Sequence, residues 1–165
     1  MIVNLQGKEA SGTMKSFGGD DPPEIVRFQP RHIDQVCMIE DCSFPNPFSR
    51  RFLLELSRLY PDTFLVAERQ GQVLGYAVAG AHHGQAHILS LAVKEGWRKK
   101  HVGLELMRAL IENLRSKQVR EIVLEVAVTN TAARTLYERL GFEMVDIIGG
   151  YYENGEAAAV YHLKL

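Results

Sequence analysis

Glu125 lies in the middle of a segment rich in valine, isoleucine and leucine, residues 121–128. If this segment is a strand, its side chains alternate, and Glu125 is the lone charge between its apolar neighbours Val123 and Ala127 on one face. Covering that face would take water from the carboxylate and raise its pKa toward the range of a general base. The alternative is a strand-end glutamate that pairs with an arginine or stays hydrated; our prediction is the base.

Two further polar residues belong to a helix predicted over residues 131–140. Tyr137 borders the apolar stripe of that helix, and its phenol, with a pKa of about 10, can return a proton to a departing thiolate. A packing role for the ring is the alternative. Asn130 precedes the helix, where its amide either caps the first turn or holds a ligand at the helix mouth.

His87 lies in a strand predicted over residues 86–93, on the face that Leu89 and Leu91 share if the alternation is regular. A histidine there is either a core residue with a satisfied ring or a base or proton relay. Together with His82 and His83 it does not predict a metal site, because no cysteine or carboxylate spacing supports one.

A basic turn connects this strand to a helix predicted over residues 103–117. The first N–H groups of a helix lack intrahelical acceptors and the helix dipole adds positive charge there, so the turn suits a phosphate. The candidate phosphate-binding residues are Arg98, Lys99, Lys100, His101, Val102 and Gly103.

Two loops carry aromatic side chains suited to an acceptor substrate. Tyr151 and Tyr152 lie between glycines and acids, in either an exposed hairpin tip or a substrate wall. Phe44, Pro45 and Phe48 belong to a rigid loop in which two prolines interrupt a helix. Our hypothesis is that folding brings the loops together into a pocket for the cationic amino terminus of a peptide.

The composition is that of an ordinary globular protein. The chain has 165 residues, 46% of them hydrophobic and 24% charged, with a net charge of −1. That charge argues against a general nucleic-acid binder, and no apolar run approaches the roughly 20 residues that span a bilayer. Cys37 and Cys42 project from different faces of one predicted helix, which disfavours a disulfide and favours a reducing cytoplasm.

The hydrophobic pattern predicts one domain over residues 24–165, preceded by a glycine- and proline-containing extension over residues 1–23 that its own domain or a neighbouring chain holds. Apolar strands on either side of a helix, at 86–93 and 121–128, are typical of a parallel βαβ unit. The other predicted strands are 25–28, 63–69, 72–81, 142–148 and 157–165. The other predicted helices are 49–59 and one that starts at Pro30 and carries the stripe Ile33, Val36, Cys37 and Phe44.

Three segments, residues 87–93, 97–103 and 123–142, resemble the GNAT superfamily of acetyl-CoA-dependent N-acetyltransferases. The pattern LEVxxxN…A…LYExLGF and the later Gly-Tyr-Tyr…Gly-Glu segment are similar to the Nα-acetyltransferases, both the bacterial type that modifies a ribosomal-protein alanine and the archaeal type. The resemblance, which runs from about Glu24 to Leu165, implies an α/β (α+β) fold. Its mixed, mostly antiparallel sheet of about seven strands has a V-shaped splay between strands 4 and 5, with about four helices.

The resemblance also implies roles for individual residues. Glu125 would act as base toward the amine through water, Tyr137 would protonate the leaving thiolate, and His87 would be a second base or hold the water. Tyr151 and Tyr152 would line the substrate side. The residues implied to bind acetyl-CoA are Leu91, Ala92, Val93, Arg98, Lys99, Lys100, His101, Val102, Gly103, Leu104, Asn130 and Tyr137. Direct transfer in a ternary complex is expected, since neither Cys37 nor Cys42 lies in the matching segments.

The chain departs from the family at His101, where glycine is usual, and at Glu105, where a small residue is usual. A Cβ at position 101 strains a turn that benefits from glycine, although an imidazolium can compensate by touching phosphate. The implied acceptor is a protein or peptide N-terminus, including a ribosomal protein, with no metal, membrane or nucleic-acid partner and a monomer or weak homodimer. The alternatives are acetylation of a small-molecule amine and a non-catalytic acetyl-CoA-binding module.

Overall fold

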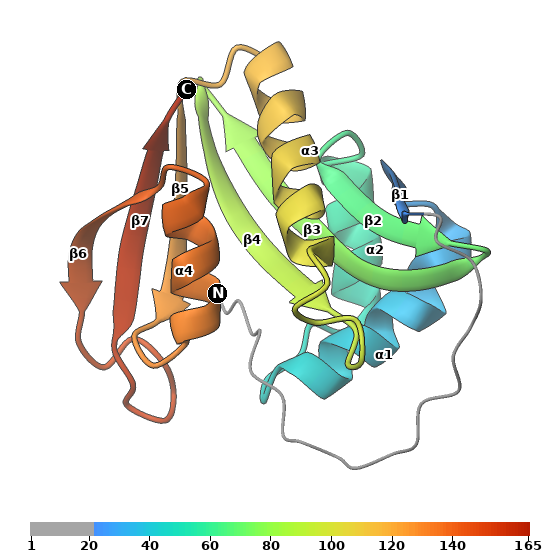
Figure 1. Cartoon of the computed structure of the whole chain (residues 1–165), viewed down its shortest axis with the longest axis horizontal. Coiled ribbons are helices and arrows are strands. Elements are labelled where there is room, and N and C mark those ends of the chain that lie inside the picture. Colours follow the sequence, from blue (N-terminus) through green and yellow to red (C-terminus); the bar gives the residue numbers. More distant parts are fainter. Residues whose placement is uncertain (1–21) are drawn as a thin grey trace.

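The computed structural model describes residues 22–165 and shows a seven-stranded sheet with helices on both faces (Figure 1). The strands are β1 (Glu24–Arg27), β2 (Phe64–Arg69), β3 (Gln72–His82), β4 (Gln85–Val93), β5 (Glu121–Ala127), β6 (Glu143–Ile148) and β7 (Ala158–Lys164). Their order is β1-β2-β3-β4-β5-β7-β6, and every neighbouring pair is antiparallel except β4 and β5. The predicted N-terminal extension lies outside the described residues, apart from Pro22 and Pro23.

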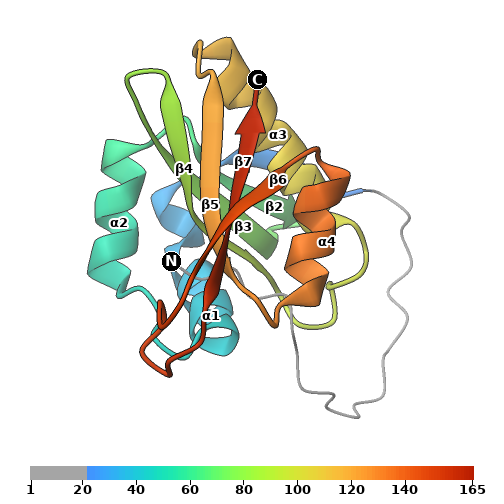
Figure 2. The same cartoon turned by 90° about the vertical axis from the view of Figure 1, so that its left-hand side faces the viewer.

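Four α-helices form two outer layers. They are α1 (Ile33–Ser43), α2 (Arg50–Leu59), α3 (Val102–Ser116) and α4 (Thr131–Arg139), and a 3₁₀ turn, Pro30–His32, precedes α1. Figure 2 shows α1 and α2 on one face of the sheet and α3 and α4 on the other. The solvated side of α3 carries two ion pairs at i,i+3 spacing, with 2.9 Å between Arg108 and Glu105 and 3.1 Å between Arg115 and Glu112.

The sheet opens between its two parallel strands. Pairing of β4 with β5 covers only Gln85–His87 opposite Glu121–Val123, whereas β5 stays paired with β7 from Glu121 to Ala127. Beyond His87 the strands diverge into a V, which Figure 1 shows from the α3 side. The predicted fold class, a mixed and mostly antiparallel sheet splayed between the fourth and fifth strands, is confirmed.

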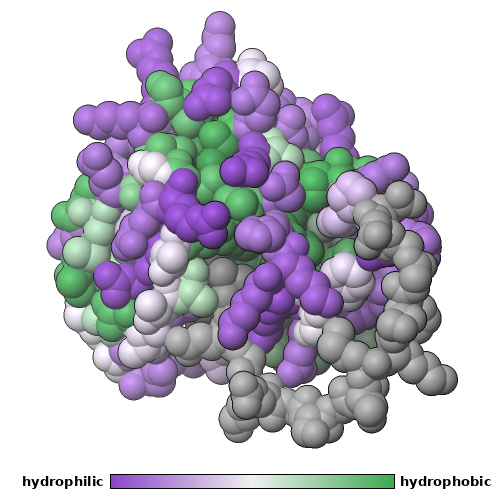
Figure 3. Space-filling view, in the orientation of Figure 1, coloured by the Kyte–Doolittle hydropathy of each residue, from purple (hydrophilic) through white to green (hydrophobic). Residues whose placement is uncertain are grey.

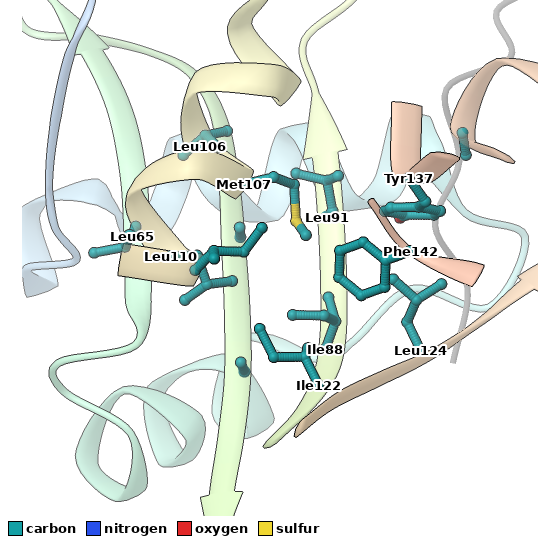
Figure 4. Packing of buried hydrophobic residues seen from close by; sticks show 14 of the residues in the cluster. Leu65, Ile88, Leu91, Leu106, Met107, Leu110, Ile122, Leu124, Tyr137 and Phe142 are labelled. Atoms are coloured by element: carbon teal, nitrogen blue, oxygen red, sulfur yellow. The ribbon is translucent and has the colours of Figure 1, made fainter. Parts of the chain in front are cut away.

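Of the two hydrophobic cores, one spans this splay and the other lies on one side of it. The core beneath α3 and α4 is continuous across it, because Leu91 and Met107 pack in the same cluster as Leu124, Tyr137 and Phe142 (Figure 4). The core beneath α1 and α2 takes its buried residues only from β1 to β4 and the elements that cover them. One side of the splay is therefore closed by apolar packing, and the face that carries Glu125 is outside both cores.

A β-bulge changes which way the side chains of β4 face. Val78 pairs with Ser90 but Ala79 pairs with Ile88, so Leu89 is an extra residue in β4. Leu91 consequently packs beneath α3, while Leu89 contacts the core beneath α1 and α2. The prediction that His87 shares a face with Leu91 is wrong, and so is the core alternative, because the His87 side chain is 46% exposed.

Local sequence signals explain the helix ends. Ser49 caps α2, with its Oγ accepting a hydrogen bond of 3.2 Å from the Phe52 N–H. The first helix ends at Ser43 rather than including Phe44, because the residue before a proline is driven into extended backbone and Phe44 has φ −129° and ψ 140°. Gly141, with φ +89°, follows α4 in the left-handed conformation that glycine allows.

Over residues 22–165, no helix combines the length and apolar character needed to cross a bilayer. Within the same residues, no group of three or more His, Cys, Asp or Glu side chains is arranged to hold a metal ion. Cys37 and Cys42 are both free thiols.

Candidate active site

His87 and Glu125 meet across the point where the sheet opens. His87 is the last residue of β4 that pairs with β5, and its Nε2 lies 2.6 Å from Oε2 of Glu125, two residues beyond the last paired position of β5. The Glu125 side chain is 12% exposed. The hydrogen bond from His87 outweighs burial and lowers the pKa of Glu125, so the predicted rise of this pKa is wrong. The site therefore holds an ionised carboxylate at neutral pH.

Tyr151 and Tyr152 approach the same carboxylate from the loop between β6 and β7. Burial raises the pKa of both phenols, and the negative charge of Glu125 raises it further. Their rings pack edge to face with centroids 5.0 Å apart. These two tyrosines therefore belong to the face of the splay that carries Glu125.

The two loops predicted to form an acceptor pocket are joined. Asn46 Nδ2, in the α1–α2 loop (residues 44–48), donates a 2.7 Å hydrogen bond to Oε2 of Glu153 in the β6–β7 loop. Within the first loop, Phe44 is buried in the core beneath α1 and α2, Pro45 is exposed, and Phe48 is half-buried against Phe52. Pro45 and Phe48 are thus more accessible to an acceptor than Phe44 is.

Tyr137 is fully buried on the other side of the splay. Its ring packs against Phe142 and Tyr161, with centroid distances of 5.6 and 6.1 Å. Its hydroxyl has no hydrogen-bond partner among residues 22–165, and neither has the buried hydroxyl of Tyr152. Burial raises the pKa of Tyr137 well above its usual value, and the negative charge that Tyr152 carries when ionised adds to this shift. Tyr137 is consequently a neutral phenol with an O–H bond available to a ligand.

Asn130 is the N-cap of α4. Its Oδ1 accepts a 3.1 Å hydrogen bond from the Ala133 N–H, and the residue is 4% exposed. Asn130 therefore caps the first turn of the helix, which is one of the two roles that the sequence suggested for it. The cap fixes the start of the helix that carries Tyr137.

The open part of β4 offers backbone groups to the splay. Leu91, Ala92 and Val93 pair with β3 on one side, but the described part of β5 pairs with none of them on the other. The backbone groups on that side cannot be satisfied by the sheet, so they are available to an extended ligand.

A pocket of about 310 Å³ lies at the N-terminus of α3, beside α4. Hydrophilic side chains gather over this turn (Figure 3). His101 is the N-cap of α3 and Lys99 lies close to it; both have left-handed backbone, with φ of +63° and +60°. The lining residues are Val93, Trp97, Arg98, Lys99, His101, Val102, Gly103, Leu104, Ala132, Thr135, Leu136 and Arg139.

The basic residues of the turn make different contacts. Arg98 donates from Nε to the Val93 carbonyl at 3.1 Å, which ties the turn to the end of β4. Lys100 does not line the pocket; its Nζ lies 4.9 Å from the Trp97 ring centroid, and Arg69 lies 5.5 Å from the same centroid. Of these basic residues, Lys99 and His101 therefore line the pocket together with the first residues of α3.

Sequence reasoning missed the α4 wall of this pocket and Trp97. The α4 residues Ala132, Thr135, Leu136 and Arg139 recur at helical spacing, which places them on one side of the helix, so that periodicity was the available signal. No sequence pattern indicates that α4 lies against the basic turn, because that contact depends on how β5 and β4 diverge.

Residues 33–142 match the acetyltransferase (GNAT) family. An uncharacterized N-acetyltransferase of Methanocaldococcus jannaschii is 38% identical over 81% of this chain and 86% of its own length. An N-alpha-acetyltransferase of Sulfurisphaera tokodaii is 31% identical over 76% of this chain and 83% of its own length.

Solved structures show the same architecture. Ard1 of Thermoplasma volcanium superposes with a TM-score of 0.83 at 28% identity, covering 88% of this chain and 99% of that one. The ribosomal-protein-S18-alanine N-acetyltransferase of Escherichia coli gives a TM-score of 0.78 at 25% identity, covering 86% of this chain and 92% of that one. The splayed sheet, the family match and these relatives agree, and the chain is an acetyltransferase that belongs to the GNAT family.

Proposed function

We propose that this chain transfers the acetyl group of acetyl-CoA to the α-amine of protein or peptide N-termini. The observation that carries the proposal is the pairing of two unlike groups across one splay: an ionised carboxylate, Glu125, on one face and a neutral buried phenol, Tyr137, on the other. The relatives named as N-alpha- and ribosomal-protein-alanine acetyltransferases support this acceptor class.

The co-substrate would bind along the open strand and the basic turn. The pyrophosphate fits the pocket at the start of α3, where helix N–H groups and the side chain of Lys99 favour an anion. The pantetheine amides would pair with the edge of Leu91–Val93 that β5 leaves unpaired, as an extra strand would. The thioester then lies in the splay, between the two sheet faces.

Glu125 and His87 provide the base. An α-amine with a pKa of about 7.7–8.0 is largely protonated at neutral pH and must lose a proton before it can attack the thioester carbon. Glu125 accepts that proton, directly or through one water, while His87 holds the carboxylate at the mouth of the splay. Tyr151, Tyr152 and the joined loops line the acceptor side of this carboxylate.

Tyr137 completes the transfer. Attack of the amine nitrogen forms the new C–N bond, and the C–S bond then breaks as the thiolate takes the proton of the Tyr137 hydroxyl. The nitrogen releases its second proton to water, and the Tyr137 phenoxide regains a proton from water before the next turnover. Positioning of the two substrates in line supplies much of the remaining acceleration. Transfer is direct, since Cys37 and Cys42 lie on α1 and not in the splay.

A peptide library tests this function. Peptides that vary in their first two residues, including ribosomal-protein N-termini, are incubated with labelled acetyl-CoA and the wild-type chain, with Glu125→Gln as control. Label on the α-amine of a subset of peptides is the expected result. Rapid labelling of a free polyamine with none on peptides would assign the chain to small amines. Acetyl-CoA binding without any transfer would make it a binding module.

A further inference from the structure

The α1–α2 loop is held at both ends by one residue. Two of its five residues are prolines, so only Phe44, Asn46 and Phe48 have backbone N–H groups. The Glu40 carbonyl accepts the Phe44 N–H at 3.0 Å, and the Glu40 Oε1 accepts the Phe48 N–H at 2.9 Å. Glu40 therefore takes two of the three backbone donors of this loop.

The other carboxylate oxygen of Glu40 points into the sheet. The Tyr76 hydroxyl, from β3, donates to Oε2 of Glu40, and it lies 2.8 Å from Oγ of Ser90 in β4. Tyr76 and Ser90 are both fully buried, and Ser90 is next to Leu91, whose backbone borders the splay. A chain of hydrogen bonds thus runs from the α1–α2 loop to the strand on which acetyl-CoA is proposed to lie.

A carboxylate in this position is costly for the fold. Glu40 is 1% exposed, and burial raises its pKa to about 7. Its neighbours Val36, Ile39 and Phe44 are apolar core residues, and an apolar side chain in such a place is often at least as stable as a buried charge. The hydrogen bonds to Phe48 and Tyr76 are specific compensations, and both lead toward the site.

We infer that Glu40 is a positioning residue that fixes the α1–α2 loop against β3 and β4 and so sets the affinity for the acceptor without touching it. The inference rests on the proposed function, because the loop carries Pro45 and Phe48 and is joined to the tyrosine loop through Asn46. Glu40 lies on α1, within the core, and unlike Glu125 it would position a loop rather than accept a proton from the substrate.

Steady-state kinetics and amide hydrogen exchange of the full chain test this role. Glu40→Ala removes the side-chain acceptor, Glu40→Gln keeps an oxygen for the Phe48 N–H, and Ile39→Ala is a matched control in the same buried turn of α1. In Glu40→Ala, we expect the acceptor KM to rise about tenfold, with kcat and the acetyl-CoA KM within about twofold, since the Phe48 N–H loses its hydrogen-bond acceptor. The Phe48 amide should exchange faster in Glu40→Ala, and Glu40→Gln and Ile39→Ala should resemble wild type in both measurements.

An unchanged acceptor KM, or an equal rise in Ile39→Ala, would overturn the inference. If Glu40→Ala does not fold, Tyr76→Phe decides: a raised acceptor KM supports the chain of hydrogen bonds and an unchanged one refutes it. If the wild-type chain acetylates no peptide, the proposed function fails separately, and the exchange rate of the Phe48 amide still decides whether Glu40 holds the loop.

Discussion

The imidazole of His87 and the carboxylate of Glu125 are bonded at the position where the β4–β5 ladder stops, with 2.6 Å between Nε2 and Oε2. The strands can part beyond this point because no further backbone pairing joins them. The same pair therefore marks the apex of the splay and places a negative charge there.

Glu125→Gln should lower kcat by about 10²–10⁴, the usual contribution of a general base, because the amide cannot accept the amine proton. Acetyl-CoA affinity should stay unchanged, since Glu125 lies outside the pocket at α3. Steady-state kinetics with calorimetry of acetyl-CoA binding measures both. Full activity in this variant would place the base elsewhere.

The pH dependence of kcat/KM should follow the pKa of the acceptor's α-amine. His87 lowers the pKa of Glu125, so the pair stabilises the fold above the unfolded carboxyl pKa near 4.5, and that stability is lost only as the pH falls through the lower folded pKa. Glu125 is thus ionised from pH 6 to 9, where the α-amine, with a pKa of about 7.7–8.0, still titrates. The acid limb should shift when acceptors of different amine pKa are compared. A limb that stays in place would mean that an enzyme group controls it.

Tyr137→Phe should slow turnover without weakening the fold. We expect kcat to fall by about 10²-fold through loss of the proton donor. The free energy of unfolding should be equal or higher by about 1 kcal/mol, because the variant removes a buried hydroxyl with no partner in the described chain. Kinetics and urea titration give the two values. A clearly destabilised variant would show that the hydroxyl has a structural partner.

Glu40→Gln should change how stability depends on pH. The folded state keeps the Glu40 proton up to a pKa of about 7 while the unfolded chain releases it near 4.5, so stability falls as the pH rises through this interval. Glutamine does not titrate, and the variant should gain up to about 3 kcal/mol on wild type between pH 4.5 and 8. Urea titrations at both pH values measure the difference. A constant difference between the two proteins would contradict the raised pKa.

His101→Gly should keep acetyl-CoA affinity within about threefold and leave the melting temperature equal or higher. Residue 101 has φ +63°, where a Cβ costs about 1 kcal/mol that glycine avoids. His101→Ala, which loses the imidazole but keeps the Cβ, is the matched control. A large loss of affinity in both variants would instead assign a phosphate contact to the imidazole.

The sequence was sufficient where local rules decide the structure. Strand alternation placed Glu125 opposite Leu124 and Val126, and the Ser49 cap and the ion pairs of α3 follow from spacing alone. The splay and its position came from the resemblance, because periodicity indicates a parallel pair but not where its pairing ends.

Features that depend on several elements were not predictable. One extra residue at Leu89 turned His87 away from Leu91, and the partner that lowers the pKa of Glu125 comes from a strand 38 residues away. The sequence does not distinguish Glu40 from the other acids of its helix, because its partner Tyr76 lies on a strand packed beneath it and is bonded in turn to Ser90. Such contacts are set by packing of the folded chain.

The short ladder between β4 and β5 also has a mechanical consequence. Only three register pairs join β4 to β5 in the described sheet, and the apolar cluster beneath α3 supplies most of the remaining connection between its two halves. In the proposed complex, the pantetheine arm lies along β4 in the part of the splay that has no strand pairing. Acetyl-CoA would then add a connection along the part of the splay that lacks one, and its binding should raise the free energy of unfolding of the domain.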